Sequence, residues 1–267
     1  MGTAFMRLLG EGAISLTRSE VDLAETDTIP KVLADVDPDV IINCAAYTNV
    51  DRAESEEDLA TLINGTAVEV MADWAESKQR RLLTFSTDYV FGGDATTPYV
   101  ETSPTDPINA YGRTKLHGEV AALAAGALVV RASWVISGSH PSFVSTILRA
   151  AKDGPLRVVD DQWGCPTVSH DLAVTSLEAL RTGMTGLLHV TNQGPATWFD
   201  LARASLGEAG LDPEAVSPCP TEEYPTPARR PAYSVLASER LRDAGLAPPP
   251  PWSQSLPAVI AEIKTWL

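Results

Sequence analysis

The sequence is poor in the residues that build disulfide frameworks and metal sites. Its three cysteines, Cys44, Cys165 and Cys219, are far apart and odd in number, and no Cys-x-x-Cys pair occurs. The four histidines show no spacing typical of metal ligands. These features argue against a disulfide-stabilised secreted domain and against a structural zinc. We therefore expect no metal site, and free thiols that are mostly buried in a protein of the reducing cytoplasm.

Long apolar runs and clusters of positive charge are also scarce. No stretch approaches the ~20 apolar residues that span a bilayer, and we expect no signal peptide because no basic segment leads into an apolar one. Lysine and arginine number 20 against 35 aspartate and glutamate residues, which gives a net charge of −15. Nucleic acids and anionic membranes bind basic surfaces, so we expect neither as a partner. An anionic ligand would have to be held by a few local cations.

Strand and helix signals alternate through the first two thirds of the 267 residues. Apolar runs without alternation, typical of strands buried in a parallel sheet, recur between segments with helical periodicity. This α/β pattern predicts a parallel sheet with helices on both faces. We expect strands at 14–16, 40–44, 81–86 and 128–132, and helices from residue 2 to 9, from 26 to 36, from 55 to about 74, and from about 110 to 125.

The pattern changes from about residue 141. Predicted elements become shorter, prolines cluster between 218 and 231, and Pro248–Pro251 forms a stiff linker before a last helix. We predict a first domain at 1–140 with returning elements near 160–192, and a smaller, irregular domain mainly at 141–267.

The stretch "NAYGRTKLHGE" carries a pair of residues with catalytic chemistry. Tyr111 and Lys115 are four residues apart in a helical segment, so their side chains share one face. An ammonium beside a phenol lowers the phenol pKa from about 10, which makes Tyr111 a candidate general acid for a carbonyl oxygen. Alone the pair is weak evidence, because a tyrosine and a lysine also fall at this spacing by chance.

A second stretch, "LLTFSTDYVFGG", ends a predicted strand in polar residues. Ser86 and Thr87 fall where a parallel sheet opens its ligand crevice. The Thr87 hydroxyl can donate to the same carbonyl oxygen that Tyr111 protonates. A plain turn or capping hydroxyl is an equally good interpretation of Thr87.

A strand ending Ser-Thr-Asp-Tyr-Val-Phe, followed by Tyr-x-x-x-Lys, resembles the extended short-chain dehydrogenase/reductase superfamily. More narrowly, the chain is similar to the dTDP-4-dehydrorhamnose reductases. That match also rests on "NCAAYTNVDRAE" (43–54), "VVRASWV" (129–135), "VVDDQWGCPT" (158–167) and "ARRPAYSVL" (228–236). The resemblance implies a Rossmann-like, doubly wound parallel sheet in a dinucleotide-binding domain, with a smaller substrate-binding α/β domain. It implies an NADPH-dependent cytoplasmic enzyme, compatible with a homodimer, that reduces the C4 ketone of a dTDP-4-keto-6-deoxy sugar in deoxysugar or rhamnose biosynthesis.

The resemblance also implies roles for the matching residues. Thr87, Tyr111 and Lys115 form the implied catalytic set, in which Tyr111 supplies the proton while Lys115 holds the nicotinamide ribose and tunes Tyr111. The implied cofactor contacts are Gly2, Arg18, Asp22, Leu23, Ala45, Ala46, Tyr47, Thr48, Ser86, Tyr111 and Lys115. The implied substrate contacts are Asp88, Tyr89, Trp134, Arg229 and Arg230.

Several of these residues have a simpler interpretation. Arg18 lies where dinucleotide enzymes choose between cofactors, and a cation there suits the 2′-phosphate of NADPH, with NADH as the alternative. Arg229 and Arg230 suit a diphosphate, but they also fit a solvated pair. Trp134 is either a sugar contact or an ordinary core aromatic.

The chain departs from the family pattern at its start. The family opens on a strand and a glycine-rich turn, which bring the cofactor pyrophosphate to a helix N-terminus. Here Gly2 matches the last glycine of that turn, and helical spacing follows directly. The strand concerned is central in the order 3-2-1-4-5-6, so we expect a longer native chain rather than a degenerate member. Ala4 replaces a glutamate that serves a metal in some members, so the resemblance implies no metal here.

One local difference bears on the reaction. Sugar-nucleotide 4,6-dehydratases carry Asp-Glu after the threonine, whereas this chain has Asp88 and Tyr89, which favours simple reduction. Two other functions stay open. One is a non-catalytic partner protein of the same fold, like the regulatory subunit of methionine adenosyltransferase, and the weaker one is a sugar-nucleotide epimerase.

Overall fold

A parallel sheet of four strands lies at the centre of the computed structural model, which describes residues 1–267. Neighbouring strands are all parallel, with Ile41 opposite Leu82 and Leu83 opposite Leu128. In order across the sheet the strands are β1 (Val40–Asn43), β2 (Arg81–Thr87), β3 (Leu128–Ala132) and β8 (Gly186–His189). Every residue of β3 is buried, as the apolar sequence without alternation predicts.

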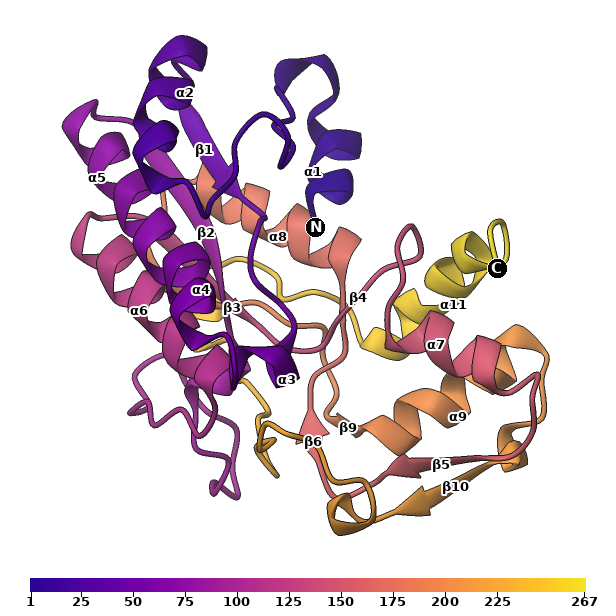
Figure 1. Ribbon diagram of the computed structural model, residues 1–267. Coiled ribbons are helices and arrows are strands. Elements are labelled where there is room, and N and C mark those ends of the chain that lie inside the picture. Colours follow the sequence, from indigo (N-terminus) through magenta and orange to yellow (C-terminus); the bar gives the residue numbers. More distant parts are fainter.

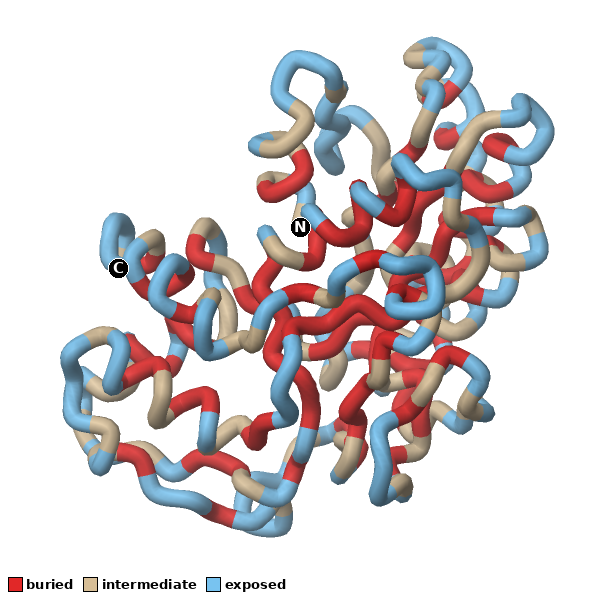
Figure 2. Tube along the Cα trace, turned by 180° about the vertical axis from the view of Figure 1, so that it is seen from behind, coloured by how far each residue is buried: buried red, intermediate tan, exposed pale blue.

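Helices cover both faces of this sheet (Figure 1). Val129 packs on one side among α2 (Ile29–Val36), α5 (Ala67–Ser77) and α6 (Ala110–Ala124). Its neighbour Val130 packs on the other side with α1 (Gly2–Leu9) and α8 (Ser169–Arg181). Successive strand residues point to opposite faces, so one strand serves both cores. The predicted doubly wound α/β sheet is confirmed, and the buried positions run through its centre (Figure 2).

The predicted strand at 14–16 is wrong. Residues 13–17 form no regular element after the short turn η1 (Gly10–Gly12), and the Ile14 side chain is exposed. No strand lies beside them, and a strand forms only where a neighbour accepts and donates its backbone hydrogen bonds. Strand β1 pairs with β2 alone and is an edge of the sheet.

The helix predicted from residue 55 to about 74 is not one continuous α-helix. It consists of α4 (Glu57–Thr61), a π-helical turn η3 (Leu62–Thr66) and α5. Such turns add a residue to a helix and occur often at functional sites.

A second hydrophobic core is built from the later part of the chain. It lies among α7 (Phe143–Ala150), α9 (Trp198–Ala209), α11 (Trp252–Ile263) and the parallel pair β5 (Leu156–Val159) and β10 (Val216–Cys219). Figure 1 shows this lobe beside the sheet. Shorter elements complete the fold: α3 (Val50–Ala53), β4 (Val135–Ile136), β6 (Trp163–Gly164), β7 (Thr167–Val168), β9 (Ala196–Thr197) and α10 (Glu239–Asp243), with η2 (Thr26–Thr28), η4 (Asp88–Val90), η5 (Pro213–Ala215) and η6 (Thr221–Glu223).

The chain returns to the sheet at α8, β8 and α10. Arg240 of α10 donates to the backbone carbonyls of Leu187 (2.5 Å) and Thr185 (3.2 Å), and this covers the β8 edge. The sequence-predicted boundary between residues 140 and 141 stays a prediction. All three cysteines are free thiols, and no helix combines the length and the apolar character needed to cross a membrane.

A network of charged side chains is buried between helix α6 and strand β3. Glu119 of α6 and Arg131 of β3 form an ion pair in which each side chain is only 3% exposed. Arg131 also lies over the Phe91 ring and donates through Nη1 to Nε2 of His189 at 3.3 Å. Because Nδ1 of His189 donates to the Ala237 carbonyl at 3.0 Å, both ring nitrogens are satisfied in the neutral form.

This arrangement predicts a pH dependence of stability. Burial, with the nearby Arg131 charge, lowers the pKa of His189 to about 3, whereas an unfolded histidine titrates near 6.5. As the pH falls below 6.5, the unfolded chain binds a proton that the folded chain refuses, so stability is lost. The variant His189→Gln keeps a donor and an acceptor but no titration. Between pH 7.5 and 5 we expect the wild type to lose about 2 kcal/mol more unfolding free energy than the variant, measured by urea denaturation. Equal losses would contradict the buried neutral histidine.

Candidate active site

The candidate catalytic residues meet at the carboxyl end of β2. Thr87 is the last residue of that strand, and α6 begins beside it at Ala110, as predicted. Asn109 caps the helix, since its side-chain oxygen accepts from the Gly112 N–H at 2.8 Å. Its amide nitrogen donates to the Arg229 carbonyl at 2.9 Å, which ties the start of α6 to the later part of the chain.

Helix α6 approaches the turn after β2 very closely. A Cβ atom at Gly112 would lie 2.1 Å from the Tyr89 carbonyl oxygen, so only glycine fits there. The approach brings the rings of Tyr89 and Tyr111 edge to face, with 6.0 Å between their centroids. The sequence motif "AYG" therefore places Tyr111 against the strand end as well as on the helix.

Lys115 lies one helical turn further on and is buried. Its Nζ atom donates to the Phe85 carbonyl at 2.6 Å, and burial lowers its pKa to about 8 in spite of the Glu119 charge. The neighbouring Ser86 hydroxyl is buried and has no hydrogen-bond partner within the protein. Lys115, Ser86 and Asn64 lie around the same narrow space, in which the Ser86 hydroxyl is the group without a partner.

The predicted lowering of the Tyr111 pKa is wrong. Burial, and then the negative charge of Asp88, raise the pKa of Tyr111 to about 12, although contact with the Thr87 hydroxyl opposes this in part. The Lys115 ammonium has the Phe85 carbonyl as its partner instead of the phenol. Tyr111 is therefore protonated at neutral pH, which is the form a general acid needs.

Asp88 is buried below the strand end, with only 2% exposure. Its carboxylate accepts from the hydroxyls of Thr87 (3.0 Å), Ser133 (2.8 Å) and Ser234 (2.6 Å). Burial raises its pKa to about 6, against the effect of these hydrogen bonds. The resemblance places Asp88 against the sugar, and this stays a prediction, while in the structure both carboxylate oxygens accept from protein hydroxyls. Tyr89, which is half-buried, is the more accessible of the two.

Asn64 is a site residue that sequence analysis missed. It lies in the π-helical turn and is buried, and its side-chain oxygen accepts from the Tyr47 N–H at 2.9 Å. Its amide donates to the Tyr47 carbonyl and to the Thr114 hydroxyl, both at 3.0 Å. Asn64 thus fixes the segment after β1 to the catalytic helix. The signal was the Asn-Gly pair inside a helical pattern, which marks an interrupted helix.

The remaining predicted cofactor contacts fall into two groups. Ala45, Ala46, Tyr47 and Thr48 follow β1 at the same end of the sheet as Thr87, and Ala45 and Thr48 are exposed.

The residues near the start of the chain are arranged differently. Gly2 is the exposed first residue of α1, and Arg18 forms an ion pair with Asp22 (Nε to Oδ2, 3.1 Å). Leu23 packs in the core with Ile29 and Leu33, so its side chain is closed to a ligand.

The two predicted diphosphate arginines differ in their surroundings. Arg229 is exposed, whereas Arg230 is only 17% exposed and holds Asp51 through both nitrogens at 2.7 and 2.9 Å. Asp51 belongs to α3, so this bidentate pair links the "ARRP" segment to the sheet domain.

Trp134 is held in an unusual backbone conformation. Its φ of 45° is rare for a bulky residue, and its indole stacks on Trp198 with 3.6 Å between ring centroids. A Cβ at Gly164 would lie 2.4 Å from the indole. Trp134 is partly exposed and packed on both sides, so it combines a core contact with an accessible edge.

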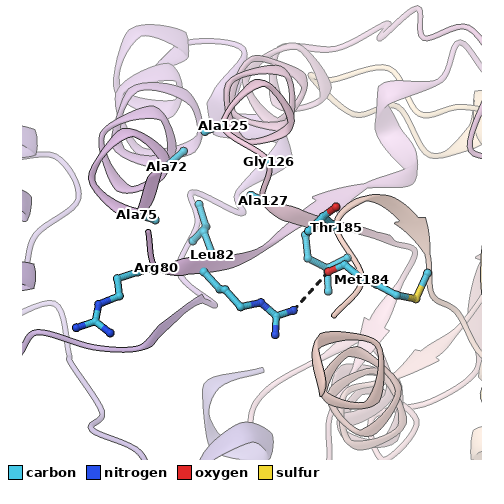
Figure 3. Close-up of a pocket in the computed structure, with 11 residues that line it drawn as sticks. Ala72, Ala75, Arg80, Leu82, Ala125, Gly126, Ala127, Met184 and Thr185 are labelled. Atoms are coloured by element: carbon cyan, nitrogen blue, oxygen red, sulfur yellow. Dashed lines mark hydrogen bonds between the residues drawn. The ribbon is translucent and has the colours of Figure 1, made fainter. Parts of the chain in front are cut away.

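A cavity of about 50 Å³ lies elsewhere, at the amino ends of the strands (Figure 3). Its lining includes Leu82, Gly126 and Met184, and the guanidinium of Arg81 contacts the Met184 carbonyl there at 3.5 Å. Ligand crevices of such sheets lie at the opposite, carboxyl end of the strands, so this cavity is not part of the site.

Comparisons with known proteins agree with this geometry. The family described as RmlD substrate binding domain matches residues 1–265. A dTDP-4-dehydrorhamnose reductase of Mycolicibacterium smegmatis is 44% identical over 260 residues, which cover 95% of this chain and 79% of the relative. The chain belongs to the dTDP-4-dehydrorhamnose reductase family. The reductase of that name from Escherichia coli is 37% identical, over 91% of this chain and 86% of its own.

Solved structures of the family have the same fold. A dTDP-4-dehydrorhamnose reductase of Clostridium acetobutylicum superposes with a TM-score of 0.94 at 34% identity, covering 98% of this chain and 95% of that one. The reductase of Bacillus anthracis, solved in complex with NADP, gives 0.91 at 33% identity, with 97% and 95% covered. The resemblance inferred from the sequence motifs is confirmed.

Proposed function

We propose that the chain is an NADPH-dependent reductase that converts the C4 ketone of a dTDP-4-keto-6-deoxy-hexose to an alcohol. The observation that carries the proposal is the half-buried Tyr111 beside Thr87 at the end of β2, with its phenol protonated at neutral pH and Lys115 on the same helix. The family membership gives the substrate class, since its relatives are named for reduction of such sugars. The exact sugar is left open by a Streptomyces antibioticus relative, 41% identical, named for a different dTDP-ketosugar.

Residues of the site fit the nicotinamide end of the cofactor. Bound NADPH would supply the hydride that reduces the ketone carbon. Lys115 and the unpartnered hydroxyl of Ser86 offer hydrogen bonds to its ribose, and the exposed Ala45 and Thr48 leave room beside the strand ends. Among the other predicted contacts, Arg18 forms an ion pair with Asp22, and the Leu23 side chain lies in the core. The predicted part of Arg18 in cofactor choice stays a prediction, as does the contact of Leu23.

The protein's own residues account for the proton. Tyr111 donates its phenolic proton to the carbonyl oxygen as that oxygen gains charge. Thr87 lies beside Tyr111, and its hydroxyl would support the same oxygen by turning its proton from Asp88 to the substrate. Lys115 is buried with its ammonium on the Phe85 carbonyl, and we assign to it the nicotinamide ribose rather than the phenol.

The substrate is assigned to the region between the sheet end and the second lobe. Tyr89 and the exposed edge of Trp134 are proposed for the sugar, and Arg229 and Arg230 for the diphosphate. A cytoplasmic location and a homodimer are consistent with the family but stay predictions.

The test is turnover of a dTDP-4-keto-6-deoxy sugar. We expect NADPH absorbance to fall on mixing with the purified chain and the ketosugar, in proportion to alcohol formed and identified by NMR. NADH in place of NADPH measures cofactor preference, and a ketosugar lacking the nucleotide is the control that should react far more slowly. Absence of NADPH oxidation with the dTDP-sugar would refute the proposed reaction and favour a non-catalytic partner.

A further inference from the structure

Asp88 is the buried acid of the site, and all its partners are neutral hydroxyls. The donors come from three separate segments: Thr87 at the end of β2, Ser133 just after β3, and Ser234 from the later part of the chain. A buried carboxylate that is held without a cation depends on such hydrogen bonds, because desolvation disfavours its charge.

We propose that Asp88 is a positioning residue, which fixes the Thr87 hydroxyl beside Tyr111 and joins the second lobe to the catalytic strand end. This proposal rests on the proposed reductase function and refines the role of Asp88 within it. It differs from a direct substrate contact, because the three protein hydroxyls occupy its oxygens.

The hydrogen-bond pattern at Thr87 supports this role. Its hydroxyl oxygen accepts from the Tyr89 N–H at 3.2 Å while its proton is given to Asp88 at 3.0 Å. These two hydrogen bonds hold the Thr87 oxygen in one position at the strand end, from which the hydroxyl can turn its proton from Asp88 to the substrate oxygen.

The other two partners link Asp88 to the region of β6, which pairs with β9 directly before α9 of the second lobe. The Ser133 hydroxyl accepts from the Cys165 N–H at 3.2 Å. The Ser234 N–H donates to the Trp163 carbonyl at 2.7 Å, and its hydroxyl donates to Asp88. Through these serines, the carboxylate holds the segment 163–165 against the end of β2.

The charge of Asp88 also acts on the surrounding titratable groups. Burial is the main cause of the raised pKa values of Tyr111 of α6, Tyr89 of η4 and Cys165, and the Asp88 charge raises them further. The nearby cations do not pair with Asp88. Arg230 interacts with Asp51 and Tyr89, and the Lys115 ammonium donates to the Phe85 carbonyl. A carboxylate at Asp88 therefore adds to burial in favouring the protonated form of Tyr111.

Protonation of Asp88 would disturb the arrangement. Below a pH of about 6 one carboxyl oxygen becomes a donor, so one of the three hydroxyls has to turn away. We therefore expect an acid limb near pH 6 in the profile of kcat for ketone reduction.

The principal test is Asp88→Asn, assayed with NADPH and a dTDP-4-keto-6-deoxy sugar. We expect kcat to fall about 10- to 100-fold, KM for the sugar to change by less than about twofold, and the acid limb to disappear. A raised KM with unchanged kcat would mean that Asp88 binds the substrate directly, and would overturn the proposal. Asp73→Asn, an exposed carboxylate on α5, is the matched control and should behave as wild type.

A milder variant guards against loss of folding. Ser234→Ala removes one hydrogen bond that lowers the pKa of Asp88, so the acid limb should move to higher pH while kcat falls less than in Asp88→Asn. A limb that does not move would overturn the proposal. NMR titration of carbon-labelled aspartate follows Asp88 without any turnover. A wild type that shows the raised pKa but reduces no ketosugar would refute the reaction alone, whereas the absence of an aspartate with raised pKa would refute the proposed state of Asp88.

Discussion

Replacement of Tyr111 by phenylalanine is expected to lower kcat for ketone reduction by about 10²- to 10⁴-fold, the usual contribution of a positioned general acid. The ring and its edge-to-face contact with Tyr89 are retained, so only the proton donor is lost. Because Tyr111 is only partly buried and its hydroxyl makes no backbone hydrogen bond, we expect the free energy of unfolding to change little.

The measurement is steady-state NADPH oxidation together with equilibrium binding of NADPH. Tyr111→Phe should bind the cofactor like the wild type, while Tyr224→Phe, at an exposed loop position, should match the wild type in both assays. Turnover by Tyr111→Phe within about threefold of wild type would mean that another group is the general acid. Thr87 would then be the next candidate.

The largest stability effect is expected at the Glu119–Arg131 pair. Glu119→Gln leaves the Arg131 guanidinium buried without a counter-charge, and breaking a buried pair typically costs about 3–5 kcal/mol. The matched control is Glu57→Gln. Glu57 of α4 pairs with Arg113, which lies on α6 like Glu119. That pair is about half exposed, so its loss should cost no more than ~1 kcal/mol.

Urea denaturation of the three proteins distinguishes buried from exposed charge. Equal losses for Glu119→Gln and Glu57→Gln would mean that water reaches Arg131 in solution. The double variant Glu119→Gln/Arg131→Met removes both charges and should recover part of the loss, since the penalty of the single variant is an unpaired ion.

The sheet and the catalytic helix were predictable because their signals are local. The short apolar runs at the centres of β1, β2 and β3 are typical of buried strands, and the Asn109 cap marks the start of α6. The segment at 14–16, Ile-Ser-Leu, also has apolar residues, yet strand formation depends on a neighbour that no local pattern reveals.

The electrostatics of the site could not be predicted, because they depend on burial and on contacts distant in sequence. A spacing of four residues suggests that Lys115 acts on Tyr111, but the fold gives the ammonium a backbone carbonyl and sets the Asp88 charge near the phenol. The contact of Asp88 with Ser234 spans 146 residues. No motif indicated the stacking of Trp134 on Trp198 either.

The bidentate pair of Arg230 and Asp51 has a consequence for anion binding. With its guanidinium already neutralised by a residue of α3, the "ARRP" segment carries its own counterion. A diphosphate that pairs with Arg230 must displace the Asp51 carboxylate. Binding is then the exchange of one anion for another, rather than the binding of an anion to a free cation. Added salt screens the displaced and the incoming anion alike, and the affinity for the nucleotide should then depend only weakly on ionic strength.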